Sequence, residues 1–106
     1  MSIELLYFDG CPSWQMGLAK LKDALAAKAM TDEVALVKVG NDAEAERLGF
    51  LGSPSFRVNG RELWPEPRAQ YALGCRVYQT PEGLRGTPSV AALREKLRAA
   101  MDRRVA

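Results

Sequence analysis

Residues 3–14 read IELLYFDGCPSW, a short apolar run that ends in a turn, a cysteine and a proline. Glu4 is the only polar interruption of the run, which is typical of a buried β-strand ending at Asp9-Gly10. Pro12 stands where the first position of a helix is expected, because proline has no amide proton to leave unpaired there. The stretch therefore predicts a strand, a turn that carries Cys11, and a helix directly after it.

The helix and a second strand extend this beginning. Apolar residues recur at helical spacing at four positions: Trp14, Leu18, Leu21 and Leu25. Residues 34–39 then form a second apolar run that is rich in β-branched side chains. Two strands separated by a helix most simply pair in parallel through a right-handed crossover. These elements therefore predict a β-α-β unit.

Later signals predict a short helix and a hairpin. Asn41 and Glu44 have the spacing of a capping box, and Gly49 suits the left-handed residue that ends a helix. Asn59-Gly60 lies between two short runs within residues 56–64, and this dipeptide favours the tight type I′ turn. The sheet therefore gains an antiparallel pair after the parallel one.

A final helix is expected from Thr87-Pro88-Ser89 onward, with residues 68–86 as an irregular insertion before it. The predicted order is β-α-β-α-β-β-α, an α/β fold with a central four-stranded mixed sheet. A chain of 106 residues with 47% hydrophobic side chains suits a single domain, residues 1–106. The sequence has no apolar run of bilayer length and no signal-peptide pattern, so we expect a soluble, cytoplasmic protein without membrane contact.

The amino-acid composition also excludes several classes of partner, catalytic mechanism and metal site. The net charge of +2 is spread along the chain, which argues against a nucleic-acid partner. The absence of histidine excludes Ser-His-Asp hydrolysis and His-ligated zinc or haem. The two cysteines, Cys11 and Cys75, are too few for a zinc or iron–sulfur site of their own. We therefore expect no cofactor and no metal site, and at most one dithiol pair.

The order of elements and two local motifs resemble the thioredoxin-like superfamily. Residues 9–14, DGCPSW, follow the first strand, where thioredoxins and glutaredoxins carry a reactive cysteine. Residues 52–60, GSPSFRVNG, are similar to the glutaredoxin stretch in which a cis-proline precedes the third strand. More closely, the chain looks like a group of small bacterial thioredoxin-family proteins with the same FDGCP start. The resemblance covers residues 3–64 and the final helix, and it implies a thioredoxin-like fold.

The resemblance also implies a site around Cys11. It implies a cis peptide bond at Ser53-Pro54, which presents the Ser53 backbone to a bound thiol or peptide. Pro12 and Trp14 are further candidates for substrate contact. The second cysteine of the superfamily's usual C-x-x-C motif is replaced by Trp14, so a resolving thiol within this chain must be Cys75.

The residues around Cys11 have structural roles as alternatives. At a helix N-cap, Cys11 would be a thiolate stabilised by free amides and the helix dipole, whereas many free cysteines only pack in the core. Asp9 suits a proton relay to the sulfur or a turn-forming role. Trp14 suits an apolar wall for a substrate or a core position. Solvated surface is the expectation for the scattered arginines: Arg57, Arg61, Arg68, Arg76 and Arg85.

Cys75 lies in the insertion, within residues 71–78, YALGCRVY. This placement brings it over the beginning of the first helix, beside Cys11, or leaves it elsewhere as an idle or buried thiol. A bridge between the two would close a loop of about 64 residues and stabilise the fold by about 4 kcal/mol. In a reducing cytosol such a bridge would be a redox switch. The stretch GCRVY also resembles a cysteine-containing segment of alkylmercury lyases, which suggests that the pair holds a soft metal.

Two hypotheses for the function follow. In the first, the protein is a thiol–disulfide oxidoreductase in which Cys11 attacks a disulfide, a glutathione adduct or an oxidised thiol, and Cys75 or an external thiol resolves the mixed disulfide. The alternative is a non-catalytic thiol module that binds a soft metal, Hg(II) or Cu(I), or a protein partner. The sequence leaves the oligomeric state open.

Overall fold

Within the described residues, a central sheet mixes parallel and antiparallel strand pairs. The strands are, in spatial order, β2 (Val34–Lys38), β1 (Ile3–Tyr7), β3 (Ser55–Val58) and β4 (Arg61–Glu62). β1 pairs in parallel with β2 and antiparallel with β3, and β3 pairs antiparallel with β4. The computed structural model describes residues 2–28, 30 and 33–105, of which 102–105 only as backbone. The predicted four-stranded mixed sheet is confirmed.

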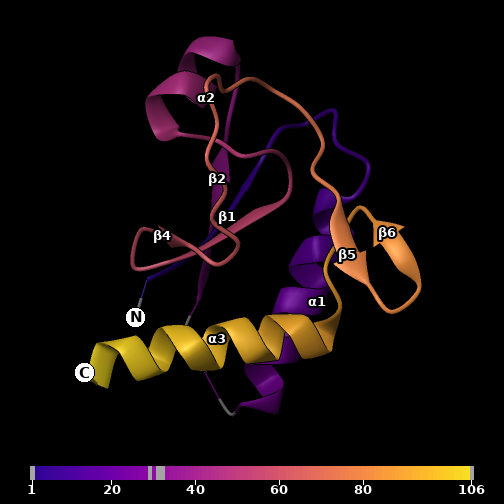
Figure 1. Cartoon of the computed structure of the whole chain (residues 1–106), viewed down its shortest axis with the longest axis vertical. Helices are drawn as coiled ribbons and strands as arrows, with labels where there is room; N and C mark the ends of the chain where they lie inside the picture. The colour runs from indigo at the N-terminus through magenta and orange to yellow at the C-terminus, as the bar shows by residue number, and fades with distance from the viewer. Residues whose placement is uncertain (1, 29, 31–32, 106) are drawn as a thin grey trace.

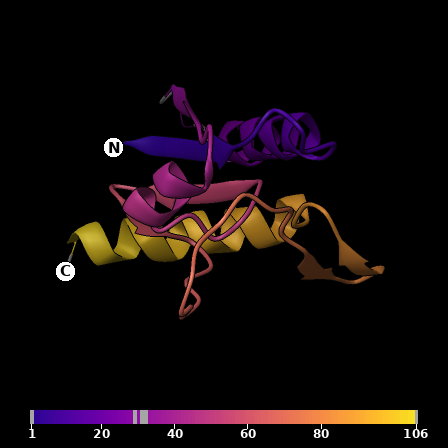
Figure 2. The ribbon, with the colours of Figure 1, turned by 90° about the horizontal axis from the view of Figure 1, so that it is seen from above.

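The described helices, which cover both faces of the sheet, are α1 (Trp14–Ala27), α2 (Asp42–Leu48) and α3 (Val90–Val105). α1 and α3 cover one face, where Leu21 and Leu93 pack with Leu5 of β1. α2 covers the opposite face, where Ala45 packs with Leu6. Figure 2 shows α3 along one side of the sheet. No helix among the described residues is both long enough and apolar enough to cross a bilayer.

Two predicted local signals are confirmed. The Asn41 Oδ1 atom accepts a hydrogen bond from the Glu44 amide at 2.8 Å, and Gly49 ends α2 with a φ of 65°. In the hairpin turn, Asn59 and Gly60 have φ values of 53° and 80°, as a type I′ turn requires. Short-range sequence patterns therefore set the boundaries of α2 and of the β3–β4 hairpin.

The insertion is more regular than the sequence predicted. It contains a second hairpin, β5 (Tyr78–Thr80) and β6 (Gly83–Arg85), which is separate from the central sheet. The Thr80 hydroxyl closes its turn, because it donates to the Gly83 carbonyl and accepts from the Glu82 amide. The expectation of an irregular segment over residues 68–86 is therefore wrong at its C-terminal end. Figure 1 shows this hairpin beside the first turns of α1.

Candidate thiol site

Cys11 lies in the tight turn between β1 and α1. Its amide donates to the Phe8 carbonyl at 3.1 Å, and its Sγ donates to the Ser53 carbonyl at 3.5 Å. Only 3% of Cys11 is exposed. The first cysteine is therefore fixed at the end of the sheet, with its thiol directed at the residue that precedes Pro54.

The predicted N-cap position of Cys11 is wrong. α1 begins at Trp14, with Ser13 as its N-cap, and the first helical hydrogen bond runs from the Gly17 amide to the Ser13 carbonyl. Pro12 belongs to the preceding turn and not to the first helical position. Residues 12 and 13 form a turn instead, so the helix begins two residues later than Pro12 predicts. The free amides at the beginning of α1 therefore lie beyond Cys11, and its predicted N-cap role gains no support.

Ser53, whose carbonyl accepts the Cys11 thiol, and Pro54 belong to the buried interior. The peptide bond between them is cis, as the resemblance implies, and both residues are fully buried. A Cβ atom built on Gly17 would lie 2.9 Å from the Pro54 Cγ, so the absence of a side chain there lets the proline pack on α1. The Pro54 carbonyl accepts the Tyr78 hydroxyl. Contact of these two residues with a substrate stays a prediction.

Cys75 is brought to the same place by backbone pairing. The Ser53 amide donates to the Gly74 carbonyl at 2.8 Å, and the Arg76 amide donates to the Ser53 carbonyl at 2.9 Å. This parallel bridge places Cys75, whose thiol is exposed, opposite Ser53, whose carbonyl accepts the Cys11 thiol. Partial burial, followed by charge on Cys11 and a hydrogen bond with it, raises the pKa of Cys75 above its ordinary value. Of the two predicted placements of Cys75, the structure has the one beside Cys11.

Gly52 and Arg76 hold the Cys75 segment against the sheet. Gly52 has a φ of +114°, and a Cβ atom there would lie 2.9 Å from the Arg76 Cβ, so only glycine allows this approach. The Arg76 guanidinium donates to the Trp64 carbonyl at 2.5 Å and lies 5.2 Å from the centre of the Tyr78 ring. These contacts position the residues on both sides of Cys75.

Glu62 links Arg76 to the β3–β4 hairpin. Its carboxylate lies 2.5 Å from Arg57 Nε and 3.6 Å from Arg76 Nη1, and both arginine side chains are largely buried. Burial raises the pKa of Glu62, and the two arginines oppose this rise without cancelling it. The expectation that Arg57 and Arg76 are solvated is therefore wrong. Sequence reasoning missed this cluster because no local pattern pairs a hairpin carboxylate with a distant arginine.

Asp9 and Trp14 have other partners in the structure. The Asp9 carboxylate lies 2.7 Å from Lys38 Nζ, with both side chains exposed, at the ends of β1 and β2. Among the described residues it has no hydrogen bond to either cysteine, so its role as a proton relay gains no support. Trp14 stacks on Tyr7 with 4.1 Å between ring centres and packs against the core. These contacts support the core role of Trp14.

The donor set of the site is two thiols. No cluster of three or more Cys, Asp or Glu side chains suited to a metal ion is found in the part of the chain that the structure describes. Comparisons of the chain with models of known families, with curated proteins and with solved structures found no match. The geometry of Cys11, Ser53 and Cys75 is therefore the basis of the functional argument.

Proposed function

We propose that this protein is a thiol–disulfide oxidoreductase whose redox pair is Cys11 and Cys75. One observation carries the proposal: the bridge between Ser53 and residues 74–76 places an exposed thiol beside a buried one, close enough for Cys11 to raise the pKa of Cys75. Two neighbouring thiols on such segments are suited to form a disulfide. Cys75 thereby takes the part of the second cysteine that the DGCPSW motif lacks.

The difference in exposure favours an order of steps opposite to the one expected from the sequence. We propose that the Cys75 thiolate attacks the substrate disulfide R–S–S–R, so that a Cys75–S–S–R bond forms and one RS⁻ leaves. The Cys11 thiolate then attacks the Cys75 sulfur, and the second RS⁻ leaves. The substrate gains two electrons, the protein pair becomes a disulfide, and the two thiol protons end on the products. Two equivalents of an external thiol reverse the sequence.

A thioredoxin-like fold is part of the same proposal. The sheet order β2-β1-β3-β4, with β1 parallel to β2 and antiparallel to β3, is compatible with it. The cysteine after β1 and the cis Ser53–Pro54 peptide lie side by side, as the resemblance implies. These features support the fold assignment, and the chemistry proposed for the thiols does not depend on it.

Single-cysteine variants test the proposed chemistry. Cys11→Ser and Cys75→Ser are each incubated with hydroxyethyl disulfide, and adducts are followed by mass spectrometry. Cys11→Ser is expected to accumulate a mixed disulfide at Cys75, and the wild-type chain to pass on to an internal bridge. Turnover with an external thiol reductant is expected to need both cysteines. Turnover that persists in the double variant, or an adduct that forms faster at Cys11 than at Cys75, would overturn the proposal.

A second candidate function rests on the same donor set. Two adjacent thiolates without a third ligand suit a soft ion that accepts linear coordination, such as Cu(I) or Hg(II). In this alternative the protein binds one ion per chain through Cys11 and Cys75 and turns nothing over. A titration with Cu(I) against a chelating competitor checks it, because each single-cysteine variant is then expected to lose tight binding. Equal binding by the wild-type chain and the double variant would contradict it.

A further inference from the structure

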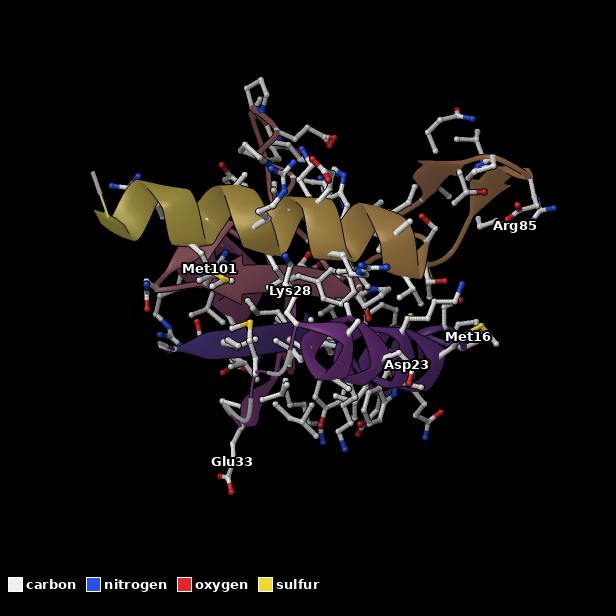
Figure 3. The ribbon with its side chains drawn as sticks, turned by 90° about the horizontal axis from the view of Figure 1, so that it is seen from below. Met16, Asp23, Lys28, Glu33, Arg85 and Met101 are labelled. Carbon is white, nitrogen blue, oxygen red and sulfur yellow. The ribbon has the colours of Figure 1, made fainter. Side chains whose placement is uncertain are left out.

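A cavity of about 280 Å³ lies between the beginning of α1, the β5–β6 hairpin and the beginning of α3. Figure 3 shows Met16, on α1, and Arg85, on the hairpin, at the end of the molecule where α3 begins. A Cβ atom built on Gly86 would lie 2.4 Å from the Ser13 Oγ, so this glycine lets the two helices begin close together. The cavity is lined by Ser13, Met16, Lys20, Thr80, Glu82, Arg85, Gly86, Thr87 and Ser89.

The lining of the cavity contains more hydrogen-bond donors than acceptors. It holds two cations, Lys20 and Arg85, and one carboxylate, Glu82. The Lys20 ammonium donates to the Thr87 hydroxyl at 2.9 Å, which leaves two of its protons for other acceptors. The Ser89 hydroxyl accepts from the Ala92 amide, and its own proton stays available. A ligand that complements this lining supplies acceptors and negative charge.

The field of the helices acts in the same direction. α1 and α3 both begin at this cavity, and neither has an acidic side chain in its first turn. The positive ends of the two helix dipoles therefore add to the charge of Lys20 and Arg85. The cavity thus favours an anion over a neutral group of the same size.

The cavity is adjacent to the thiol pair along two chain segments. Ser13 follows Cys11 by two residues, so their Cα atoms are separated by about 7 Å at most. On the opposite wall, Thr80 belongs to the strand that begins shortly after Cys75. The wall of the cavity therefore begins two residues after Cys11 and five residues after Cys75 along the chain.

We propose that this cavity binds the anionic group of a small disulfide, so that the substrate class is a low-molecular-weight disulfide that carries carboxylates. The proposal rests on the thiol–disulfide activity proposed above. The carboxylate would accept hydrogen bonds from Lys20 and Arg85. Met16, which is 60% exposed, supplies an apolar contact for the carbon chain between the sulfur and the charge.

Three disulfides that differ in charge test the proposal on the full chain. They are dithiodipropionate, which is anionic, hydroxyethyl disulfide, which is neutral, and cystamine, which is cationic. Rates of oxidation of the Cys11–Cys75 pair are divided by the rates of the same reagents with mercaptoethanol. At low ionic strength we expect a preference of about threefold to tenfold for the anionic over the neutral reagent, which shrinks at high salt.

Variants that remove one positive charge show which residues cause the preference for the anionic disulfide. Lys20→Met and Arg85→Met are each expected to lower the rate with dithiodipropionate and to leave the rate with hydroxyethyl disulfide unchanged. Lys22→Met is the matched control, since Lys22 is exposed on the same helix and does not line the cavity. Equal normalised rates for the three reagents, or a preference that survives both substitutions together, would overturn the proposal while leaving the redox pair intact.

A measurement without redox chemistry separates the two proposals. Suberate has the length and the two carboxylates of dithiodipropionate but no sulfur. Its binding to the reduced chain is followed by shifts of backbone amide signals in NMR spectra. Shifts concentrated in residues 13–20 and 80–89, and absent from Lys20→Met, support the cavity even if no disulfide is ever reduced. Shifts elsewhere, or none, count against the cavity even if the redox pair turns over.

Discussion

The turn that carries Cys11 and the segment that carries Cys75 are held in place by different means. Cys11 is bonded through its amide to Phe8 and through its thiol to Ser53, between a central strand and a long helix. The segment before Cys75 lies at the surface, where the Leu73 and Tyr71 amides donate to the exposed carboxylates of Asp42 and Glu46. The Leu73 and Tyr71 side chains pack on the core cluster that includes Ala45 of α2.

This difference bears on the proposed reaction. Cys75 is exposed and Cys11 is buried, so we expect the Cys75 segment to open locally at a lower free energy than the turn that carries Cys11. In the proposed reaction, Cys75 meets the substrate disulfide at the surface, while Cys11 stays beside Ser53. The exposed thiol reacts first, and the buried thiol completes the reaction.

The largest expected effect concerns the stability of the bridged form. A Cys11–Cys75 bond joins the segment to the core and closes a loop of about 64 residues, so it should raise the free energy of unfolding by about 4 kcal/mol. Denaturant unfolding of the oxidised and reduced chain measures the difference. Cys75→Ser is the control, and oxidant should leave its midpoint unchanged. Identical midpoints for the two wild-type forms would mean that the segment does not reach the core.

The second-largest expected effect is a difference between the two thiols in their rate of reaction with iodoacetamide. Alkylation of Cys11 needs local opening, and an opening free energy of about 3 kcal/mol slows it about 100-fold relative to an exposed thiol. Cys75 in Cys11→Ser should therefore react about 100 times faster than Cys11 in Cys75→Ser. Mass spectrometry at a single pH measures both rates. Similar rates would contradict the comparison, and denaturant should abolish the difference.

The close approach of Gly52 and Arg76, which holds the Cys75 segment against the sheet, can be disrupted by a substitution of Gly52. Alanine at this position clashes with Arg76 and strains a φ of +114°, so we expect a loss of about 2 kcal/mol in stability and slower bridge formation. Gly74→Ala is the matched control, because nothing lies within 4 Å of a Cβ atom there. The control should behave as the wild-type chain. If Gly52→Ala bridges at the wild-type rate, Gly52 does not position Cys75.

The smallest effect is on the titration of Cys75. Burial raises its pKa most, and charge on Cys11 and a hydrogen bond with it add to the rise. Cys11→Ser removes the Cys11 charge, so the pKa of Cys75 should fall relative to the wild-type chain but stay above its ordinary value. The pH dependence of alkylation at Cys75 measures it. A rise of the pKa in the variant would show that the two thiols do not interact as described.

The elements set by neighbouring residues were predictable from the sequence, and the contacts between distant segments were not. Asn41 with Glu44, and Asn59 with Gly60, act over a few residues, and both form as expected. The sequence predicted the beginning of α1 two residues too early, because Pro12 also fits the turn that precedes the helix.

The candidate site follows the same division. The turn around Cys11 was recognisable from residues 9–14, and the resemblance implied the cis bond before Pro54. The pairing of Ser53 with residues 74–76 joins segments far apart in the sequence, so it stayed one of two alternatives. The burial of Arg76 depends on Glu62 and Trp64, which no periodic pattern connects to it.

The central claim is that the buried thiol of Cys11 and the exposed thiol of Cys75 react with each other within one chain. It is tested by oxidising the reduced chain with one equivalent of hydroxyethyl disulfide at several protein concentrations and mapping the products by peptide mass spectrometry. The account predicts a mixed disulfide at Cys75 that converts to a Cys11–Cys75 bond, at a rate independent of protein concentration. Chains joined to one another through Cys75, with Cys11 still free to be alkylated after denaturation, would contradict it.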